Sequence, residues 1–414
     1  MRNGLFTQFS IMLALSLLLP AIGAERVFAQ GGADEAPVLE RIDPQDWTVR
    51  AQVFAGSQPL RGRRGIWFGT TFDLERAVIV FPLLKETASS ETHVDRIDSE
   101  LRIDNVVVDD EVTLMGGFPS GQGLGRWDVQ DVRGQTLRLI VNIPMTTWST
   151  RYNEERAMQI DWPTGEWPGL PKSALQHQHH VDSNHPVIQR IVDRWTNGAP
   201  KSVPPAMLAK QLAGKTLEHM QPVGQGVVPD RLGRFGGLEM QGSAEAAIAK
   251  RGSPFDLASL LCAVYRAAGL PARVVIGYDI HQSLGQASGI VAPHPDCGEF
   301  RDVPSNIPIL HAWVEFFLYD EAAEEGWWIP VDIVRMRQFS SRAQPMNRPW
   351  KFFGTHECLN SMAPLSFHYH PPTTVVALGA PGLWGWLPVP EIPSMEQVLM
   401  FDAMHTPQRG GQKP

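Results

Sequence analysis

The sequence predicts an α+β protein in which an N-terminal β-sandwich precedes a domain of helices followed by an antiparallel sheet. Between about Asp43 and Arg156, apolar residues alternate with a period of two, as in half-buried strands. Beyond about Asp182 the apolar spacing becomes helical, and apolar runs of strand length follow the last helix. Helices first and strands second is the order of an α+β domain.

The alternation is clearest in residues 136–143, where Leu137, Leu139, Val141 and Ile143 would share one face of a strand. Further short apolar runs are separated by Gly, Asp and Pro turn signals and lie at 77–81, 103–108 and 127–129. We therefore expect an immunoglobulin-like β-sandwich over residues 40–160. The Pro-rich stretch that follows, and the histidines after it, predict a linker over residues 161–180.

In the second part, Val187, Ile188, Ile191, Val192 and Trp195 have helical spacing. A start signal at Asp182 or Ser183 and a stop signal at Asn197 and Gly198 bound this helix. The other elements expected are a helix over 206–220, a Gly-rich loop over 224–242, a short helix from Ser243, a central helix, and strands over 273–278, 312–318 and 327–333. The second domain would occupy residues 181–375, and the Pro- and Gly-rich residues 376–414 would form a C-terminal tail.

The first residues have the layout of a secretory signal peptide: Arg2, an apolar run over 11–22, and then small residues. The run is shorter than the roughly 20 residues that a membrane span needs. Cleavage after Ala29 would remove residues 1–29, with Ala24 as a second candidate site. We expect an exported protein, periplasmic or extracellular, with no membrane span in the mature chain.

The charge of the chain limits its possible partners, and its cysteine count limits its disulfides. The net charge is -8 and the acidic and basic residues are interspersed, which argues against a nucleic-acid partner. Three cysteines are an odd number, so at most one disulfide forms within the chain and one thiol remains.

Three segments resemble the transglutaminase-like superfamily: residues 252–273 (GSPFDLASLLCAVYRAAGLPAR), 310–315 (LHAWVE) and 328–332 (WIPVD). The resemblance covers about half the chain, from Asp182 to Asp332, and more loosely to Tyr369. It implies a papain-like core, in which a central helix packs on an antiparallel sheet and a Cys at the start of that helix meets a His and an Asp from consecutive strands. The His and Asp positions are His311 and Asp332, which would act as a general base and the carboxylate that orients it.

The nucleophile position of the family pattern, nineteen residues before Arg273, holds Pro254. Ser253 is a good N-cap, Pro254 a good first helical residue, and Asp256 stands at the capping-box position. The helix start is thus intact, but proline offers no nucleophile, acid or base. The resemblance therefore predicts a degenerate Cys-His-Asp site.

Three other residues are candidates to replace the missing sulfur. Cys262 lies about 12 Å further along the helix axis, where a cysteine usually behaves as a small buried hydrophobe. Cys297 lies in a polar loop, where it would either form a disulfide with Cys358 or act as a displaced nucleophile. Ser253 is a weaker candidate because its oxygen would be occupied in capping the helix.

Histidines also gather at His177, His179, His180 and His185. A solvated loop is favoured here over a metal site, because zinc ligands must converge on one point and usually include Cys or a carboxylate. The pairs around His356 and His368 are weaker candidates. We expect neither a metal nor a cofactor.

Two functions follow from this sequence. The favoured one is an exported transglutaminase-like pseudoenzyme that binds a protein or peptide in its cleft without acyl transfer. The alternative is an active peptidase or acyltransferase that uses His311 and Asp332, with a displaced nucleophile such as Cys297 or an activated water.

Overall fold

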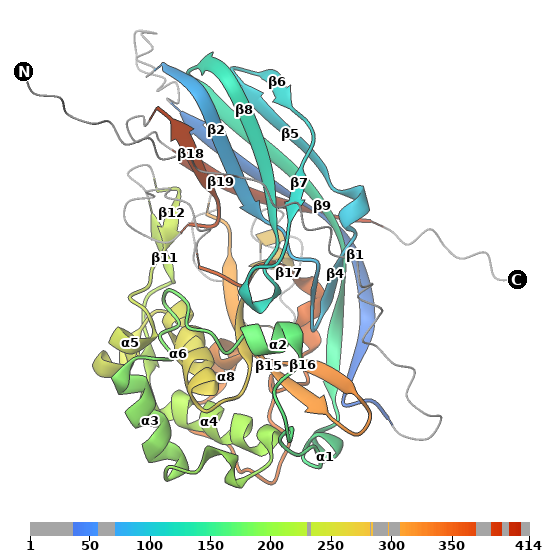
Figure 1. Cartoon of the computed structure of the whole chain (residues 1–414), viewed down its shortest axis with the longest axis vertical. Coiled ribbons are helices and arrows are strands. Elements are labelled where there is room, and N and C mark those ends of the chain that lie inside the picture. The colour runs from blue at the N-terminus through green and yellow to red at the C-terminus, as the bar shows by residue number, and fades with distance from the viewer. Residues whose placement is uncertain are drawn as a thin grey trace, which may run out of the picture.

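The structure is a computed structural model that describes residues 36–56, 71–229, 233–281, 283–284, 297, 307–369, 382–390 and 397–406. The proposed signal peptide, residues 1–29, lies outside the described residues. A strand-rich part stands at the top of Figure 1 and the helices gather at the bottom. Within the described ranges, no helix is long and apolar enough to cross a membrane.

Two antiparallel sheets form the strand-rich part. The larger has the order β19-β1-β9-β4-β3, with β5 on β9 and β6 on β5, and the smaller has the order β18-β2-β8-β7. Their strands are β1 (Leu39–Gly56), β2 (Phe72–Pro82), β3 (Glu86–Thr87), β4 (Ser90–Thr92), β5 (Asp98–Ile103), β6 (Val106–Asp109), β7 (Thr113–Met115), β8 (Leu124–Gly134), β9 (Thr136–Tyr152), β18 (Gly385–Val389) and β19 (Gln397–His405). Two short 3₁₀ helices, η1 (Val94–Arg96) and η2 (Pro119–Gly121), connect them.

The predicted alternation holds along β9, whose residues Leu137, Leu139, Val141 and Ile143 are all buried. The apolar run at 103–108 is divided by a turn, because Asp104 and Asn105 adopt the left-handed conformation that joins β5 to β6. The two sheets bury one another's apolar faces, as a β-sandwich requires.

The expectation of a C-terminal tail over residues 376–414 is wrong for two of its segments. β18 pairs with β2 in one sheet, and β19 pairs with β1 along nine residues in the other. Both strands lie at sheet edges, where β18 tolerates Pro388 because an edge strand leaves one side of its backbone unpaired. The sandwich is therefore completed by the end of the chain.

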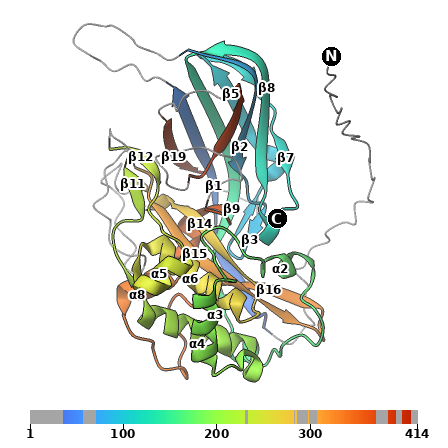
Figure 2. The same ribbon diagram turned by 60° about the vertical axis from the view of Figure 1, so that its left-hand side comes forward.

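The second part has a four-stranded antiparallel sheet of order β16-β15-β14-β17 with helices on one side (Figure 2). Its elements are α1 (Glu154–Ala157), α2 (Gly169–Ser173), α3 (Pro186–Thr196), η3 (Pro200–Ser202), α4 (Pro205–His219), β10 (Gln221–Pro222), β11 (Val227–Pro229), β12 (Phe235–Leu238), α5 (Ser243–Ala249), β13 (Arg251–Gly252), α6 (Pro254–Ala267), β14 (Ala272–Asp279), β15 (Leu310–Asp320), β16 (Glu325–Val331), α8 (Ile333–Phe339), η4 (Glu357–Ser361) and β17 (Met362–Ser366). Helix α6 is buried along its length and packs on β14 and β15.

The predicted start of α3 needs one correction. Its N-cap is His185, three residues after Asp182, and its end at the left-handed Asn197 is as predicted. Asp182 is used elsewhere, because its carboxylate accepts hydrogen bonds from the Ser243 hydroxyl (3.0 Å) and the Ala244 N–H (3.2 Å) at the start of α5.

Candidate active site

The start of α6 is built as the sequence predicts, with Pro254 as its first residue. Ser253 Oγ accepts a hydrogen bond from the Asp256 N–H (3.1 Å), and Asp256 Oδ2 accepts one from the Ser253 N–H (2.8 Å), which completes a capping box. The other oxygen of Asp256 accepts the N–H groups of Gln241 (3.0 Å) and Gly242 (2.8 Å). The helix therefore has a fully capped N-terminus that begins at Pro254.

His311 and Asp332 meet at one end of the sheet. His311 is the second residue of β15, and Asp332 follows β16 as the N-cap of α8. The two side chains form the hydrogen bond expected of them, with 2.6 Å between His311 Nε2 and Asp332 Oδ2. His311 is 4% exposed and Asp332 is fully buried. The ring of Trp313 stacks near His311, with 6.3 Å between the ring centroids.

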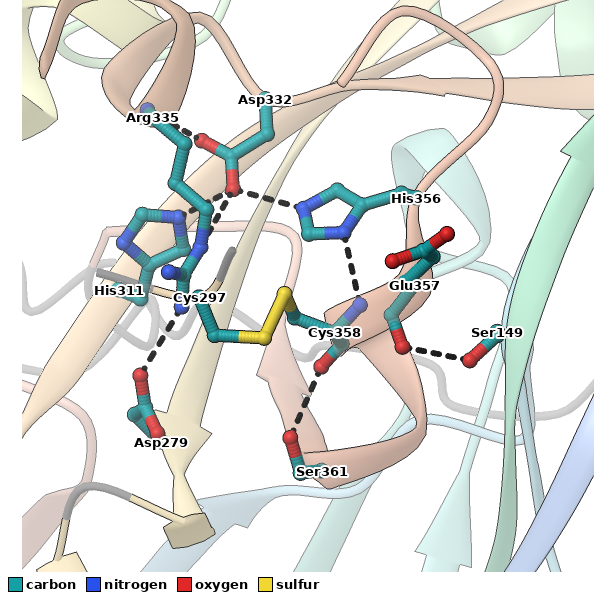
Figure 3. The surroundings of a disulfide bond; sticks show 10 residues. All are labelled: Ser149, Asp279, Cys297, His311, Asp332, Arg335, His356, Glu357, Cys358 and Ser361. Atoms are coloured by element: carbon teal, nitrogen blue, oxygen red, sulfur yellow. Dashed lines mark hydrogen bonds and ion pairs between the residues drawn. A yellow bond between two sulfur atoms is a disulfide. The ribbon is translucent and has the colours of Figure 1, made fainter. Parts of the chain in front are cut away.

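Asp332 has further partners that the sequence did not reveal (Figure 3). His356 Nε2 lies 2.9 Å from the same Oδ2 atom, and Arg335 Nε lies 3.3 Å from it. Asp332 Oδ1 accepts the Arg335 N–H at 2.9 Å, which caps α8. Arg335 also reaches Asp279 Oδ2, 3.2 Å from its Nη2. The result is a buried cluster of two carboxylates, one guanidinium and two imidazoles.

The hydrogen bonds assign the proton positions in this cluster. Burial alone raises the pKa of Asp332, but the bonds from His311 and His356 outweigh it and hold the pKa of this carboxyl well below its usual range. An ionised carboxylate only accepts, so both rings donate to it from Nε2. In neutral His311 the other nitrogen, Nδ1, is then the atom that can accept a proton.

His356 is fixed in its neutral form by a second bond. Its Nδ1 accepts the backbone N–H of Cys358 at 3.2 Å, which an imidazolium could not do. Burial lowers the pKa of His356, although the neighbouring Asp332 acts in the opposite direction. His356 therefore acts as a neutral donor that holds the Asp332 carboxylate in place.

The segment that carries His356 is held by the sandwich. On its free edge β9 also bonds to this segment, because Thr150 and His356 exchange both backbone hydrogen bonds, at 3.1 and 3.0 Å. The hydroxyl of Thr150 donates to Gly354 O (2.7 Å), and the hydroxyl of Ser149 donates to Glu357 O (2.5 Å). The first domain thus contributes to the geometry of the site and does more than tether the second.

Cys297 and Cys358 form a disulfide with 5.7 Å between their α-carbons, one of the two outcomes considered for this pair. The alternative in which Cys297 supplies a displaced nucleophile is wrong, because the sulfur of Cys297 is bonded to that of Cys358 and is not a free thiol. The bond also ties Cys297 to the segment of His356 (Figure 3).

Cys262 is fully buried in α6, as expected. Burial raises the pKa of its thiol, despite the opposing influence of Arg266. It therefore lacks both the exposure and the thiolate character that a nucleophile needs.

The histidine-rich segment gives no metal-like arrangement among the residues that the structure describes. His185 instead caps α3, where its Nδ1 accepts the Val187 N–H at 3.3 Å. The rings of His179 and His180 lie against one another, with centroids 3.9 Å apart, and His180 also contacts Tyr369. His368 lies near Gln178, with 3.1 Å between their Nε2 atoms.

His356 and Arg335 are the site residues that sequence reasoning missed. Arg335 had a local signal, because it follows Asp332 by three residues and an aspartate at an N-cap accepts the backbone N–H of the third residue after it. His356 has no comparable local signal, because its partner Asp332 is 24 residues earlier in the chain. Its only neighbouring clue is Cys358, whose disulfide brings the segment to the site.

Residues 238–333 match the family described as the transglutaminase-like superfamily. The match includes α6, β14, β15, β16 and both residues of the His311–Asp332 pair. The chain therefore contains a transglutaminase-like domain. No curated protein matches the sequence.

Three solved structures show limited similarity to this chain. A candidate cysteine protease from Cytophaga hutchinsonii is 11% identical with a TM-score of 0.49, over 89% of this chain and 92% of that one. The periplasmic domain of TgpA from Pseudomonas aeruginosa is 16% identical with a TM-score of 0.27, over 68% and 86%. Red sea bream transglutaminase is 11% identical with a TM-score of 0.23, over 57% and 45%. The fold assignment rests on the family match and on the order of the elements.

Proposed function

We propose that this chain is an exported pseudoenzyme whose transglutaminase-like domain binds a protein or peptide segment at the start of α6 without acyl transfer. The family resemblance implies a polypeptide substrate at this place. The partner would therefore be held where the family presents its thiol, beside a base and an orienting carboxylate that have no nucleophile to activate.

The state of the cysteines is the observation that carries the proposal. The chain has three cysteines: two are joined in a disulfide, and the third is buried within a helix with a raised pKa. Ser253 Oγ is engaged in capping α6, and Pro254 carries no reactive group. His311 and Asp332 nevertheless keep their hydrogen bond, which supports a retained cleft.

Export is supported by two independent features. The N-terminal sequence has the layout of a secretory signal peptide. A disulfide between loop cysteines also suits an oxidising compartment, because thiols in the cytosol are kept reduced.

The first test is labelling of the folded chain with iodoacetamide under non-reducing conditions. We expect no rapid labelling, since Cys262 is buried and the other two sulfurs are bonded to one another. Rapid labelling that His311→Ala abolishes would contradict the proposal, as would His311-dependent hydrolysis of a peptide or release of ammonia from a glutamine peptide. Turnover without labelling would instead support a water-activating enzyme.

Pro254→Cys tests the arrangement of the site directly. The new side chain would stand at the helix N-terminus near His311 and Asp332, so we expect its pKa to fall below the ordinary thiol value of about 8.5. Reactivity with iodoacetamide near pH 6 should then exceed that of a model thiol, and this excess should be lost on adding His311→Ala. The loss of a first-turn proline costs up to about 1 kcal/mol. A new thiol that titrates like a free one would show that the site is not arranged as inferred.

The same variant tests peptide binding. Peptides selected on the native chain from a random pentapeptide array should also bind Pro254→Cys. They should lose most of their affinity once fluorescein maleimide is attached at position 254, because the bulky group would fill the cleft. Unchanged binding after attachment would place the peptide elsewhere and overturn the proposed role of this cleft.

A further inference from the structure

A cavity lies beside the segment that carries His356 and is lined by its neighbours Thr355 and Glu357. Its volume is about 610 Å³, which is within the usual range for small-molecule and side-chain binding sites. Three parts of the chain form it: the residues before and within β1, the end of β9 with α1, and residues 349–357. It therefore lies where the sandwich meets the transglutaminase-like domain.

Aromatic rings form much of its wall, contributed by Tyr152, Trp350, Phe352 and Phe353. Two of these rings already have an ammonium group of the same chain near them. Lys210 Nζ lies 5.2 Å from the centre of the Trp350 ring, and Lys351 Nζ lies 5.4 Å from that of Phe352. Rings of this kind attract cations through their negative faces, although Lys210 is also held by Glu154 and Lys351 lies closer to Phe339, at 4.9 Å.

The charges around the cavity also favour a cation. Four carboxylates line it, against the two cationic side chains Arg151 and Lys351. Glu40 pairs with Arg151 at 2.9 Å, and Glu154 forms an ion pair with the buried Lys210. The carboxylates are Glu40, Glu154, Glu155 and Glu357.

Glu155 and Glu357 are both exposed to solvent, and neither has an ion-pair partner among the residues that the structure describes. In Figure 3 the carboxylate of Glu357 lies away from the Asp332 cluster. A third polar group of the wall, the hydroxyl of Tyr152, is buried without a hydrogen-bond partner in the described part of the chain. The cavity therefore presents the carboxylates of Glu155 and Glu357 beside the half-buried Tyr152, whereas Trp350, Phe352 and Phe353 are each only 2% exposed.

We propose that this cavity binds the side chain of a lysine or arginine in a peptide. The aliphatic stem would lie against the half-buried ring of Tyr152, and the cationic group would face the carboxylates of Glu155 and Glu357. This site is separate from the cleft at α6 and does not depend on the function proposed for that cleft.

The backbone of residues 355–357 connects this cavity to the cluster around Asp332. His356 adopts an extended conformation, with φ -151° and ψ 102°, so its side chain points opposite to those of Thr355 and Glu357. Thr355 and Glu357 line the cavity, while His356 between them bonds to Asp332. A ligand in the cavity would thus contact both neighbours of the residue that holds the Asp332 carboxylate.

Saturation-transfer NMR on the full chain tests the proposal, with acetyl-Gly-Lys-Gly-amide as the probe. The matched peptide carries Nε-acetyl-lysine, which keeps the stem and removes the charge. We expect saturable transfer to the lysine methylene protons and an affinity at least about fivefold weaker for the acetylated peptide. Equal binding of the two peptides, or no saturable binding of the lysine peptide, would overturn the proposal.

Variants locate the site. The double variant Glu155→Gln/Glu357→Gln should weaken binding of the lysine peptide about fivefold or more, while Glu245→Gln, at an exposed carboxylate of α5, should leave it unchanged. Fluorescein maleimide attached through Pro254→Cys should not affect it, which separates this site from the α6 cleft. Binding that survives the double variant, or that the maleimide blocks, would contradict the assignment.

Discussion

Asp332 is the residue on which the hydrogen bonds of the candidate site converge. A buried carboxylate is costly unless hydrogen bonds and opposite charge compensate for lost hydration. Here the side chain accepts bonds from His311 and His356 and caps α8, with Arg335 nearby. Removing a single donor would leave the Asp332 charge partly uncompensated, so we expect a substitution at any one of these residues to affect the whole cluster.

The buried His356 predicts that the protein loses stability in mild acid. The pKa of its ring is lowered by burial below the ordinary value of 6.5. Below pH 6.5 the unfolded chain therefore binds a proton that the folded ring does not, and the free energy of unfolding falls as the pH falls. One such group changes it by at most about 1.4 kcal/mol per pH unit. Urea unfolding at several values between pH 7.5 and 5 measures this slope.

His356→Gln should reduce the slope, because an amide can still donate to Asp332 but does not titrate in this range. His405→Gln, at an exposed histidine, should leave the slope unchanged. The lowered pKa of Asp332 acts in the same direction at lower pH, where its stabilisation is lost as the pH falls below the ordinary value of 3.8. A slope that His356→Gln does not alter would show that this ring is not buried and neutral.

At the scale of elements, β9 and the segment before η4 form a joint between the two domains. β9 pairs with β1 and β5 in the sandwich, and its last residues bond to the backbone of the segment around His356. Trp47 Nε1 and Thr147 Oγ1 both donate to Asn360 O, at 3.0 and 2.6 Å. The position of His356 is therefore set by a strand of the other domain.

Gly354→Ala should disturb this joint. Gly354 has a φ of +74°, and an added Cβ would lie 2.2 Å from Cγ of Tyr152. Strain and overlap together should lower the free energy of unfolding by about 2 kcal/mol or more. Gly198→Ala is the matched control, because its φ of +73° gives similar strain but no atom lies within 4 Å of the added Cβ. Equal losses in the two variants, measured by urea unfolding, would show that the contact with Tyr152 is not tight.

The elements that the sequence predicted are those with local signals. The capping box predicts the start of α6, and the strands expected at 273–278 and 312–318 extend only one or two residues further as β14 and β15. β18 and β19 were missed because their partners, β2 and β1, lie far away in the sequence. In β19, Leu399, Phe401 and Ala403 alternate along the inner face, but the apolar residues Val398, Met400 and Met404 on the other face hide this period of two in the sequence.

The residues of the candidate site also divide into those that the sequence predicted and those that it did not. The motifs place His311, Asp332 and Pro254 on particular elements, and the family resemblance implies that the first two meet. Nothing in the local sequence shows that His356 joins them, since its position depends on the disulfide of Cys358 and on its pairing with Thr150. Contacts between domains are properties of the assembled fold, which a local pattern does not encode.

At the scale of the whole molecule, the late strands β18 and β19 belong to the sandwich formed by the first part of the chain. β19 covers β1 in the larger sheet, and Leu399 on β19 is opposite Val53. Both side chains are buried, with Leu399 only 2% exposed. The sandwich therefore depends on residues near the end of the chain, and the transglutaminase-like domain lies between its two parts.

Leu399→Ala tests this dependence. Removing a buried leucine leaves a cavity and should lower the free energy of unfolding by about 2–5 kcal/mol. Met404→Ala in the same strand is the control, because this side chain is 58% exposed and its loss should cost no more than about 0.5 kcal/mol. Urea unfolding followed by tryptophan fluorescence measures these losses over both parts of the chain, since Trp127 is fully buried in the sandwich and Trp313 in the second sheet. Equal stabilities for the two variants would mean that β19 is not packed in the sandwich, and residues 397–405 would then be the tail that composition alone suggests.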